Sequence, residues 1–264
     1  MKKLTKVMAL VAALALVVMS FAGCGAANDT ATTNEAAAST ITFGTNAEFP
    51  PFEFVSTSGG VIDQFDGIDM AIAKEIAESN GMKAEINNME FDSLLVALQN
   101  GQIDAAIAGM TITDERKESV DFSNPYYTAT QVMIVKEDSD VASAADIADK
   151  KIAVIQGYTG EVCISDMGYK YESFKKGTDA VMELVNGKAD VVVIDLATAE
   201  KYISDNEGLK IVKDDTAFEE EQYAIAVAKG NTELLDKINT VIDKMLADGT
   251  IADLAAKYAV SSEE

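Results

Sequence analysis

From residue 41 to residue 258 the chain alternates short β-branched runs with helical segments, and this alternation most restricts its possible folds. The expected strands are residues 41–45, 84–89, 103–110, 131–136, 151–156, 170–174, 190–195, 209–213 and 222–228. The expected helices are residues 68–81, 92–101, 159–167, 178–186, 196–205, 232–247 and 250–258. In the first helix Ile68, Ile72 and Ile76 share one face, and Asp92 is expected to cap the second. The pattern predicts an α/β fold with helices on both faces of parallel sheets.

Two segments 86 residues apart repeat one local pattern. Residues 94–110 and 180–196 each contain a helix, an Asn-Gly pair, two further residues, an aspartate and an apolar strand. One Asn-Gly pair ends many helices, but two copies indicate a βα unit used in each of two lobes. The offset places Gly109 and Asp195 at equivalent strand ends, where open α/β sheets bind ligands. Two lobes with facing strand ends would form a cleft.

Arg116 is the single arginine of a chain that otherwise uses lysine for positive charge. It follows Gly109 and two hydroxyl residues, Thr111 and Thr113, on one side of the expected cleft. Its planar guanidinium can bind a carboxylate through two parallel hydrogen bonds, which a lysine ammonium cannot do. The alternative is a surface ion pair with a neighbouring acid. Its position beside a strand end favours carboxylate binding.

Asp195 ends an apolar strand on the other side of the expected cleft. Its carboxylate can cap the following helix or bind a cation. Opposite Arg116 it would complete a pair suited to a zwitterion, with Arg116 on the carboxylate and Asp195 on the ammonium. Four or five charge-assisted hydrogen bonds, about 1.5–3 kcal/mol each, could give a net binding free energy of about −8 kcal/mol.

Residues 1–23 are expected to be a signal peptide. Three lysines precede an apolar run, residues 7–18, that has the length of a secretory segment and is short for a membrane span. The following letters, FAGC, end at Cys24 and resemble the lipobox of bacterial lipoproteins, which implies cleavage before Cys24 and its acylation. An ordinary signal peptide followed by an incidental cysteine is the alternative.

Residues 24–40 are expected to carry the lipid on Cys24 and to form a flexible polar tether. Removing the leader, which has three lysines and no acid, takes the net charge from −23 to −26. This charge argues against nucleic acid and anionic lipid as partners. The chain has no histidine and one further cysteine, Cys163, so we expect no metal site and no cofactor. We expect Cys163 to be a buried small hydrophobe.

Four stretches together resemble the extracellular solute-binding proteins, family 3, of amino-acid ABC importers. They are GTNAEFPPFEF, FDGIDMAIAKEIA, FDSLLVALQNGQIDAAIAGMTITDERKESVDFSNPYY and DGTIADLAAKYA. The resemblance implies a two-lobed α/β fold of the periplasmic-binding-protein type II class that closes on one amino acid. It places lobe 1 at residues 41–129 plus 222–260 and lobe 2 at residues 130–221, with hinge strands near both boundaries.

The resemblance also implies roles for individual residues. The Gly109 backbone, the Thr111 hydroxyl and the Asp195 carboxylate would bind the α-ammonium of the ligand. Arg116 and the backbone amides of Thr111 and Thr159 would bind its α-carboxylate.

Phe49 and Phe91 would sandwich the ligand's side chain, although core packing is the commoner role of a phenylalanine. The full expected ligand-binding set is Asn46, Phe49, Phe91, Gly109, Met110, Thr111, Arg116, Tyr158, Thr159 and Asp195. The positions that would select the side chain are Asn46, Glu48, Ile155, Tyr158, Gly160 and Ile194.

By resemblance, glutamine binders carry a lysine and a histidine where this chain has Ile155 and Ile194. Basic-amino-acid binders often carry an aspartate at the position of Asn46, and Glu48 could supply a negative charge nearby unless it faces solvent. We therefore expect a polar L-amino acid as the ligand, with cationic ones included.

The sequence thus predicts a monomeric lipoprotein, outside the cytoplasm and anchored to the bacterial cell membrane. It is expected to be no enzyme and to pass a free L-amino acid to an ABC permease and its ATPase. One alternative is a sensing or adhesion lipoprotein. A dehydratase of aromatic amino-acid synthesis that shares this fold is another, and the missing histidines argue against it.

Overall fold

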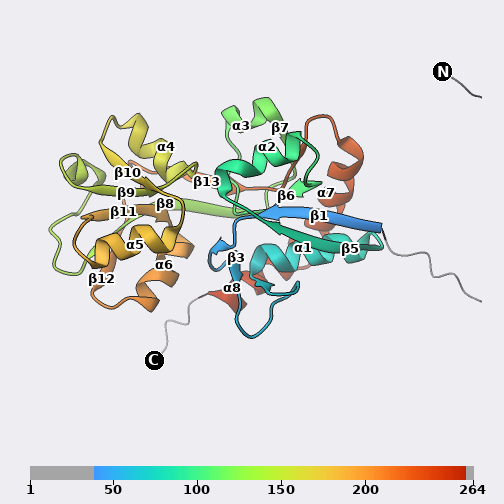
Figure 1. Cartoon of the computed structure of the whole chain (residues 1–264), viewed down its shortest axis with the longest axis horizontal. Helices are drawn as coiled ribbons and strands as arrows, with labels where there is room; N and C mark the ends of the chain where they lie inside the picture. The colour runs from blue at the N-terminus through green and yellow to red at the C-terminus, as the bar shows by residue number, and fades with distance from the viewer. Residues whose placement is uncertain (1–38, 260–264) are drawn as a thin grey trace, which may run out of the picture. The chain divides into compact units, whose positions relative to one another are not determined.

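The structure is a computed structural model that describes residues 39–259. The predicted signal peptide, Cys24 and most of the predicted tether lie outside the described residues. The described chain is α/β, with two large sheets and one small sheet (Figure 1). Between residues 39 and 259, no helix combines the length and the apolar character that crossing a membrane requires.

The first large sheet has the strand order β5-β1-β6-β14-β7. Its strands are β1 (Ser39–Thr45), β5 (Met82–Asn88), β6 (Ala105–Ala106), β7 (Val120–Phe122) and β14 (Ala226–Ala228). β1 is parallel to β5 and β6, whereas β14 is antiparallel to β6 and β7. The helices that belong with it are α1 (Ile68–Ser79), α2 (Leu94–Gln99), α3 (Asp114–Ser119), α7 (Thr232–Ala247) and α8 (Thr250–Tyr258). Ile68, Ile72 and Ile76 on α1 are buried, which confirms the predicted apolar face.

A small antiparallel sheet precedes α1 and brings two side chains of interest together. Its strands are β2 (Glu48–Phe49), β3 (Glu53–Val55) and β4 (Phe65–Asp66). β2 pairs with β3, so that Phe49 lies opposite Glu53. We call the elements of the first large sheet and of this small sheet lobe 1.

The second large sheet has the strand order β10-β9-β11-β8-β12. Its strands are β8 (Tyr127–Lys136), β9 (Ile152–Ile155), β10 (Tyr171–Phe174), β11 (Val191–Asp195) and β12 (Leu209–Val212). The helices that belong with it are η2 (Ala144–Ile147), α4 (Thr159–Asp166), α5 (Gly177–Val185) and α6 (Leu196–Asp205). Every residue of β9 and β11 is buried, as expected for strands that helices cover on both faces. We call the elements from β9 to β12 lobe 2.

Two antiparallel strands connect the lobes. The first four residues of β8 pair with β13 (Glu220–Tyr223), and the rest of β8 pairs inside the second sheet (Figure 1). β14 follows β13 and returns the chain to the first sheet. The boundaries predicted for the two lobes fall within this β8–β13 pair.

The sheets differ from the prediction in their direction. Each contains the expected parallel strands, but both also contain antiparallel ones. The reason is the crossing: β8 enters lobe 2 beside β13 and then runs opposite to β11 and β12, and β14 returns to lobe 1 opposite to β6.

Several element boundaries also differ from the prediction. β1 begins at Ser39, two residues inside the expected tether. The expected strand 103–110 pairs as a ladder only at Ala105–Ala106, and the chain turns at Gly109, where φ is 51°. The expected strand 222–228 is divided into β13 and β14. Asp92 does not cap a helix, since it lies inside a 3₁₀ helix, η1 (Phe91–Ser93), that precedes α2.

Candidate functional site

A small cavity lies where strand ends of the two lobes meet. It is lined by Phe49, Phe91, Ala108, Gly109, Thr111, Arg116, Tyr158, Thr159 and Asp195. Gly109 and Asp195, the equivalent positions of the sequence repeat, therefore meet at one cavity, and Arg116 joins them.

Two predicted residues do not line the cavity. Met110 is fully buried in the hydrophobic core, and its carbonyl accepts a hydrogen bond from the Ala224 N–H at 3.0 Å. Asn46 lies behind Tyr158, a residue that lines the cavity, and its Oδ1 accepts a hydrogen bond from the Tyr158 hydroxyl at 3.0 Å. Ala108, which does line the cavity, was not predicted, because an alanine in an apolar strand carries no functional signal.

The cavity is small for a ligand site. Its volume is about 10 Å³, room for about one water molecule, whereas ligand pockets commonly measure about 300–1,000 Å³. The cavity in this structure is therefore too small to hold an amino acid. Two larger hollows, of about 530 and 630 Å³, share wall residues with it. These are Phe91, Arg116 and Thr159 in the first and Thr111 and Thr159 in the second.

Arg116 spans the two lobes. The Thr113 hydroxyl caps α3 by accepting the Arg116 N–H, which fixes the start of that short helix. The Arg116 side chain then donates from Nη1 to the Thr111 carbonyl at 2.7 Å and from Nη2 to the Gly157 carbonyl at 2.9 Å. Its guanidinium carbon also lies 5.2 Å from the centre of the Phe91 ring, within cation–π range.

Arg116 is half-buried, and its surroundings differ from those of a surface ion pair. Burial lowers the pKa of its guanidinium, while Glu221 and Asp195 raise it. Within residues 39–259 it forms no ion pair, and neighbouring Asp114 is paired with Lys117 instead, at 3.1 Å. The structure therefore does not contain the alternative, a surface ion pair between Arg116 and a neighbouring acid.

Asp195 is the last residue of β11 and is 3% exposed. Its side chain makes no capping hydrogen bond to α6, although it occupies the capping position, so the simple capping role is not observed. It accepts a hydrogen bond from the Tyr223 hydroxyl. Burial raises the pKa of Asp195 to about 7, and the nearby charge of Glu221 adds to the rise. A cation placed beside it would favour the ionised form.

Glu221 is a site residue that the sequence did not reveal. Its Oε2 accepts hydrogen bonds from the hydroxyls of Thr111 and Thr159, both at 2.7 Å, so that the connecting strand β13 contacts both lobes. The sequence shows Glu221 only as the third acid of a run, and the two before it are exposed. The Thr111 hydroxyl, expected to bind the ligand's ammonium, is thus bonded to Glu221.

Three aromatic rings form one wall of the cavity. The Tyr158 ring of lobe 2 meets the Phe49 and Phe91 rings of lobe 1 edge-on, with centroid distances of 5.3 and 4.6 Å. Tyr158 therefore contacts the two rings that were expected to sandwich the ligand's side chain. For a side chain to lie between Phe49 and Phe91, Tyr158 has to move.

The rim of the site carries a further contact between the lobes. Lys176 Nζ lies 2.8 Å from Glu48 Oε1, and the Tyr202 hydroxyl donates to the Glu48 carbonyl at 3.1 Å. Glu48, considered above as a source of negative charge for a cationic ligand, is thus paired with Lys176 at the rim.

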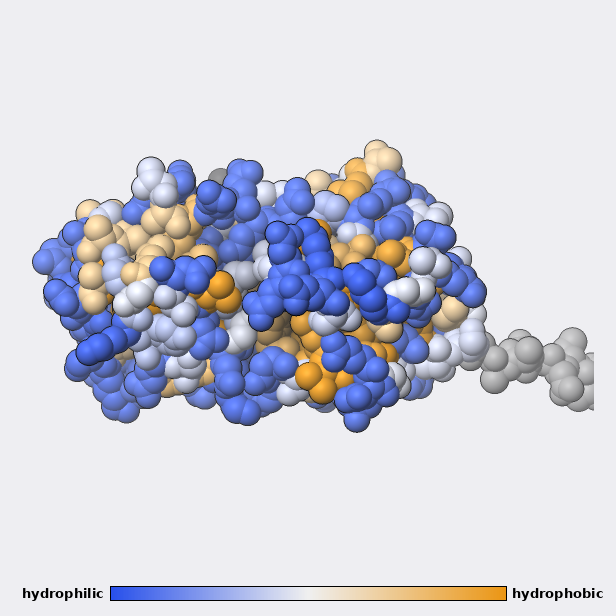
Figure 2. Space-filling model, turned by 90° about the horizontal axis from the view of Figure 1, so that it is seen from above, coloured by the Kyte–Doolittle hydropathy of each residue, from blue (hydrophilic) through white to orange (hydrophobic). Residues whose placement is uncertain are grey.

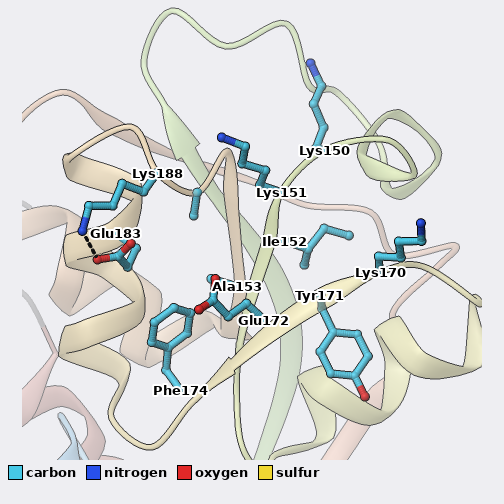
Figure 3. Close-up of a pocket in the computed structure, with 11 residues that line it drawn as sticks. Lys150, Lys151, Ile152, Ala153, Lys170, Tyr171, Glu172, Phe174, Glu183 and Lys188 are labelled. Atoms are coloured by element: carbon cyan, nitrogen blue, oxygen red, sulfur yellow. Dashed lines mark hydrogen bonds and ion pairs between the residues drawn. The ribbon is translucent and has the colours of Figure 1, made fainter.

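Other parts of the surface offer less chemistry. A hollow of about 310 Å³ lies at the exposed edge of lobe 2, where four lysines surround an apolar floor (Figure 3). None of the predicted site residues lines it. One face of the molecule is largely hydrophilic, with hydrophobic side chains in smaller areas (Figure 2). Among residues 39–259 no group of three or more potential ligands is arranged to hold a metal ion. Cys163, expected to be buried, is half-buried. Its partial burial raises the pKa of the thiol to about 11, which keeps it protonated at neutral pH.

Known proteins resemble the chain over most of its length. Residues 41–261 match the model of the bacterial extracellular solute-binding proteins, family 3. The arginine-binding extracellular protein ArtP of Bacillus subtilis is 33% identical over 92% of this chain and 94% of the relative. The probable histidine-binding protein of Neisseria gonorrhoeae is also 33% identical, over 94% of this chain and 93% of the relative.

Solved structures agree with these relatives. The arginine-, lysine-, histidine-binding protein ArtJ of Geobacillus stearothermophilus is 33% identical, with a TM-score of 0.77 over 83% of this chain and 94% of that one. An ancestral arginine-binding protein bound to arginine is 42% identical, with a TM-score of 0.75 over 83% of this chain and 97% of that one. The predicted two-lobed α/β fold is confirmed, and the chain belongs to the bacterial extracellular solute-binding proteins, family 3.

Proposed function

We propose that this chain is the substrate-binding lipoprotein of an ABC importer and captures a free L-α-amino acid between its lobes. The observation that supports this most is the meeting of Arg116 and Asp195, 79 positions apart in the sequence, at one buried cavity. A guanidinium and a carboxylate on facing walls match the two charges of an amino acid. Each bond to such a ligand would be charge-assisted and shielded from water, which makes it strong.

Capture requires the contacts between the lobes to break and re-form. In the open form Arg116 gives up the Gly157 carbonyl, and Tyr158 leaves Asn46 and the two phenylalanine rings. The ligand's α-carboxylate then takes the guanidinium fork, and its α-ammonium takes Asp195 and the Gly109 carbonyl. Backbone amides at the start of α4, at Thr159, complete the carboxylate site, since a helix N-terminus favours an anion. Closure about the β8–β13 pair seals the ligand.

We propose a polar ligand and place basic amino acids first among the candidates. The groups around the cavity carry more negative than positive charge, because Asp195 and Glu221 both face Arg116. The named relatives bind arginine, lysine or histidine, which supports the same order. Asn46 stands where, by resemblance, basic-amino-acid binders often carry an aspartate, so a neutral polar amino acid is the second candidate.

The remaining parts of the proposal concern the partners. Acylation at Cys24 would hold the protein at the outer face of the bacterial membrane, and residues 25–38 would let it reach the permease. The ATPase would drive release of the ligand into the cell. We propose a monomer that is not an enzyme, because its charged groups are engaged in holding the ligand.

A thermal-shift screen of the twenty amino acids tests the proposal on the mature chain from residue 24. Because only the folded state binds, ligand at about 100 times Kd stabilises it by about 2.7 kcal/mol. For a chain of this size that corresponds to a rise in Tm of roughly 5–10 °C. We expect this rise with at least one polar L-amino acid and not with its D-enantiomer. The absence of a shift with all twenty would remove the amino-acid-binding proposal.

A further inference from the structure

Two acidic side chains are fully buried behind the cavity. Glu53 on β3 and Asp69 on α1 both have 0% exposed surface. Within residues 39–259 neither forms an ion pair with a lysine or an arginine. Buried acids without a cation are costly unless they are hydrogen-bonded or protonated. Two acids that the fold keeps in its core without a cation are therefore expected to be hydrogen-bonded, with a proton on at least one of the two carboxyl groups.

The hydrogen bonds around the pair are unequal. Asp69 Oδ2 accepts from the Gly109 N–H at 2.8 Å and from the Tyr126 hydroxyl at 2.9 Å. The other three carboxyl oxygens, Oε1 and Oε2 of Glu53 and Oδ1 of Asp69, receive no hydrogen bond from any described residue. Two ionised carboxylates cannot satisfy each other, because both are acceptors only. One proton on Glu53, donated to Asp69, would give both a partner. The two residues lie close together, because the Asp69 N–H donates to the carbonyl of Phe52, the residue before Glu53, at 2.9 Å.

The pair touches two walls of the cavity from behind. Asp69 holds the Gly109 N–H directly. Glu53 lies opposite Phe49 across the β2–β3 ladder. Gly109 and Phe49 are themselves packed closely, since a Cβ added to Gly109 would lie 2.6 Å from Phe49 Cε1. A change at the carboxyl pair is therefore transmitted to both walls.

We propose that Glu53 and Asp69 share a single proton and act as positioning residues that hold Gly109 and Phe49 in the geometry that binds ligand. The inference rests on the proposed function, because it concerns the same cavity. Loss of the shared proton would place two like charges side by side in the core. The Asp69–Gly109 contact would then shift, and affinity would fall.

The surroundings of the pair support a proton that persists to neutral pH. The groups that face it are Tyr126, which donates to Asp69, and Tyr158 and Asp195, which lie near Glu53. Burial raises the pKa of Glu53 well above its usual value, and the charge of Asp69 raises it further. Burial raises the pKa of Asp69 to about 6, against the bonds from Gly109 and Tyr126.

The substitution Glu53→Gln tests the proposal, because a glutamine amide donates to Asp69 at every pH. We expect Glu53→Gln to bind ligand as tightly as the wild type near about pH 6 and at least about tenfold more tightly near about pH 9. Deprotonation of the ligand's own ammonium weakens both proteins equally, so the ratio of their affinities isolates Glu53. The matched control is Glu78→Gln on the exposed side of α1, which should follow the wild type throughout.

Calorimetry over this pH range has distinguishable outcomes. A ratio of affinities that stays constant with pH would overturn the proposal for Glu53. A wild type that binds no amino acid at any pH would instead remove the proposed function. To cover a Glu53→Gln protein that fails to fold, carbon-13 NMR of the labelled wild type follows its glutamate carboxyl groups without ligand. We expect one to titrate far above the ordinary glutamate range, and titration of all of them near about pH 4.3 would also overturn the proposal.

A second pair of variants separates positioning from general stability. Asp69→Asn keeps an acceptor for the Gly109 N–H, whereas Asp69→Ala removes it. We expect Asp69→Ala to weaken ligand binding by at least about tenfold in the folded fraction, with Asp69→Asn recovering most of the loss. Equal affinities of the folded fractions of wild type, Asp69→Asn and Asp69→Ala would assign Asp69 to stability alone.

Discussion

Replacing Arg116 by lysine separates the geometry of the guanidinium from its charge. Arg116 donates to carbonyls in both lobes, at 2.7 and 2.9 Å, and lies over the Phe91 ring. A lysine ammonium keeps the positive charge but has no planar fork. In the ligand complex the same fork is expected to hold both oxygens of the α-carboxylate.

The size of the effect follows from the bonds that are lost. One charge-assisted hydrogen bond contributes about 1.5–3 kcal/mol, and a partly desolvated cation–π contact about 0.5–2 kcal/mol. Losing one charge-assisted hydrogen bond, even at the lower end of its range, exceeds the roughly 1.4 kcal/mol that corresponds to a tenfold change in Kd. We therefore expect Arg116→Lys to weaken amino-acid binding by at least about tenfold.

Isothermal titration calorimetry with the ligand found in the screen measures this change. The matched control is Lys117→Gln, which alters the charge of the next residue, an exposed lysine paired with Asp114. The control should bind as the wild type does. An Arg116→Lys protein that is folded and keeps wild-type affinity would refute the reasoning, because the fork would then contribute nothing to the site.

Three further predictions concern two other walls of the cavity and its rim. Burial raises the pKa of Asp195 to about 7, so affinity for the ligand's ammonium should increase as the pH rises through about 7. In calorimetry, Asp195→Asn should bind the ligand weakly and show no such increase. Gly109→Ala should lower the free energy of unfolding in urea by about 1–3 kcal/mol, because φ is 51° at Gly109 and the added Cβ would meet Phe49. An unchanged urea midpoint would contradict this packing. Lys176→Ala removes the ion pair with Glu48 at the rim. The side chains of Lys176 and Glu48 are 48% and 27% exposed, so urea denaturation should show a decrease in the free energy of unfolding of no more than about 1 kcal/mol.

The pH dependences of the two buried acids run in opposite directions, which makes them separable. Asp195 binds a cation better when ionised, so its contribution to affinity grows with rising pH. Glu53 is proposed to act when protonated, so its contribution declines with rising pH. The affinity of the wild type should then pass through a maximum as the pH rises. Asp195→Asn should remove the increase on the acidic side, and Glu53→Gln should reduce the decrease on the alkaline side.

Stability should also respond to Glu53, with a sign that follows from its raised pKa. An acid whose pKa is higher in the folded state than in the unfolded state opposes folding as the pH rises above its unfolded value. The contribution of Glu53 to stability should therefore decline from its unfolded pKa near about 4.3 up to its raised pKa in the folded state, and Glu53→Gln should lose less stability over this range. The same comparison at low pH should show little difference.

The sequence by itself determined the elements, the family and the principal pair of charges. Apolar periodicity placed α7 and α8 at the residues where the structure has them. The repeat of the βα unit marked Gly109 and Asp195 as equivalent strand ends, and the singular Arg116 stood out by composition. These signals are local, because helix faces, strand runs and glycine turns are set by residues a few positions apart.

Only the tertiary structure decided what surrounds that pair. Glu53, Asp69 and Glu221 look like ordinary surface acids in the sequence. The hydrogen-bond partners of Asp69 and Glu221 lie 40 or more positions away, at Gly109, Thr111 and Thr159. The contact of Tyr158 with Phe49 and Phe91 likewise joins two lobes. Burial and pKa depend on which distant segments meet, and no local pattern encodes that meeting. The chemistry of the cavity therefore becomes visible only when the two lobes come together.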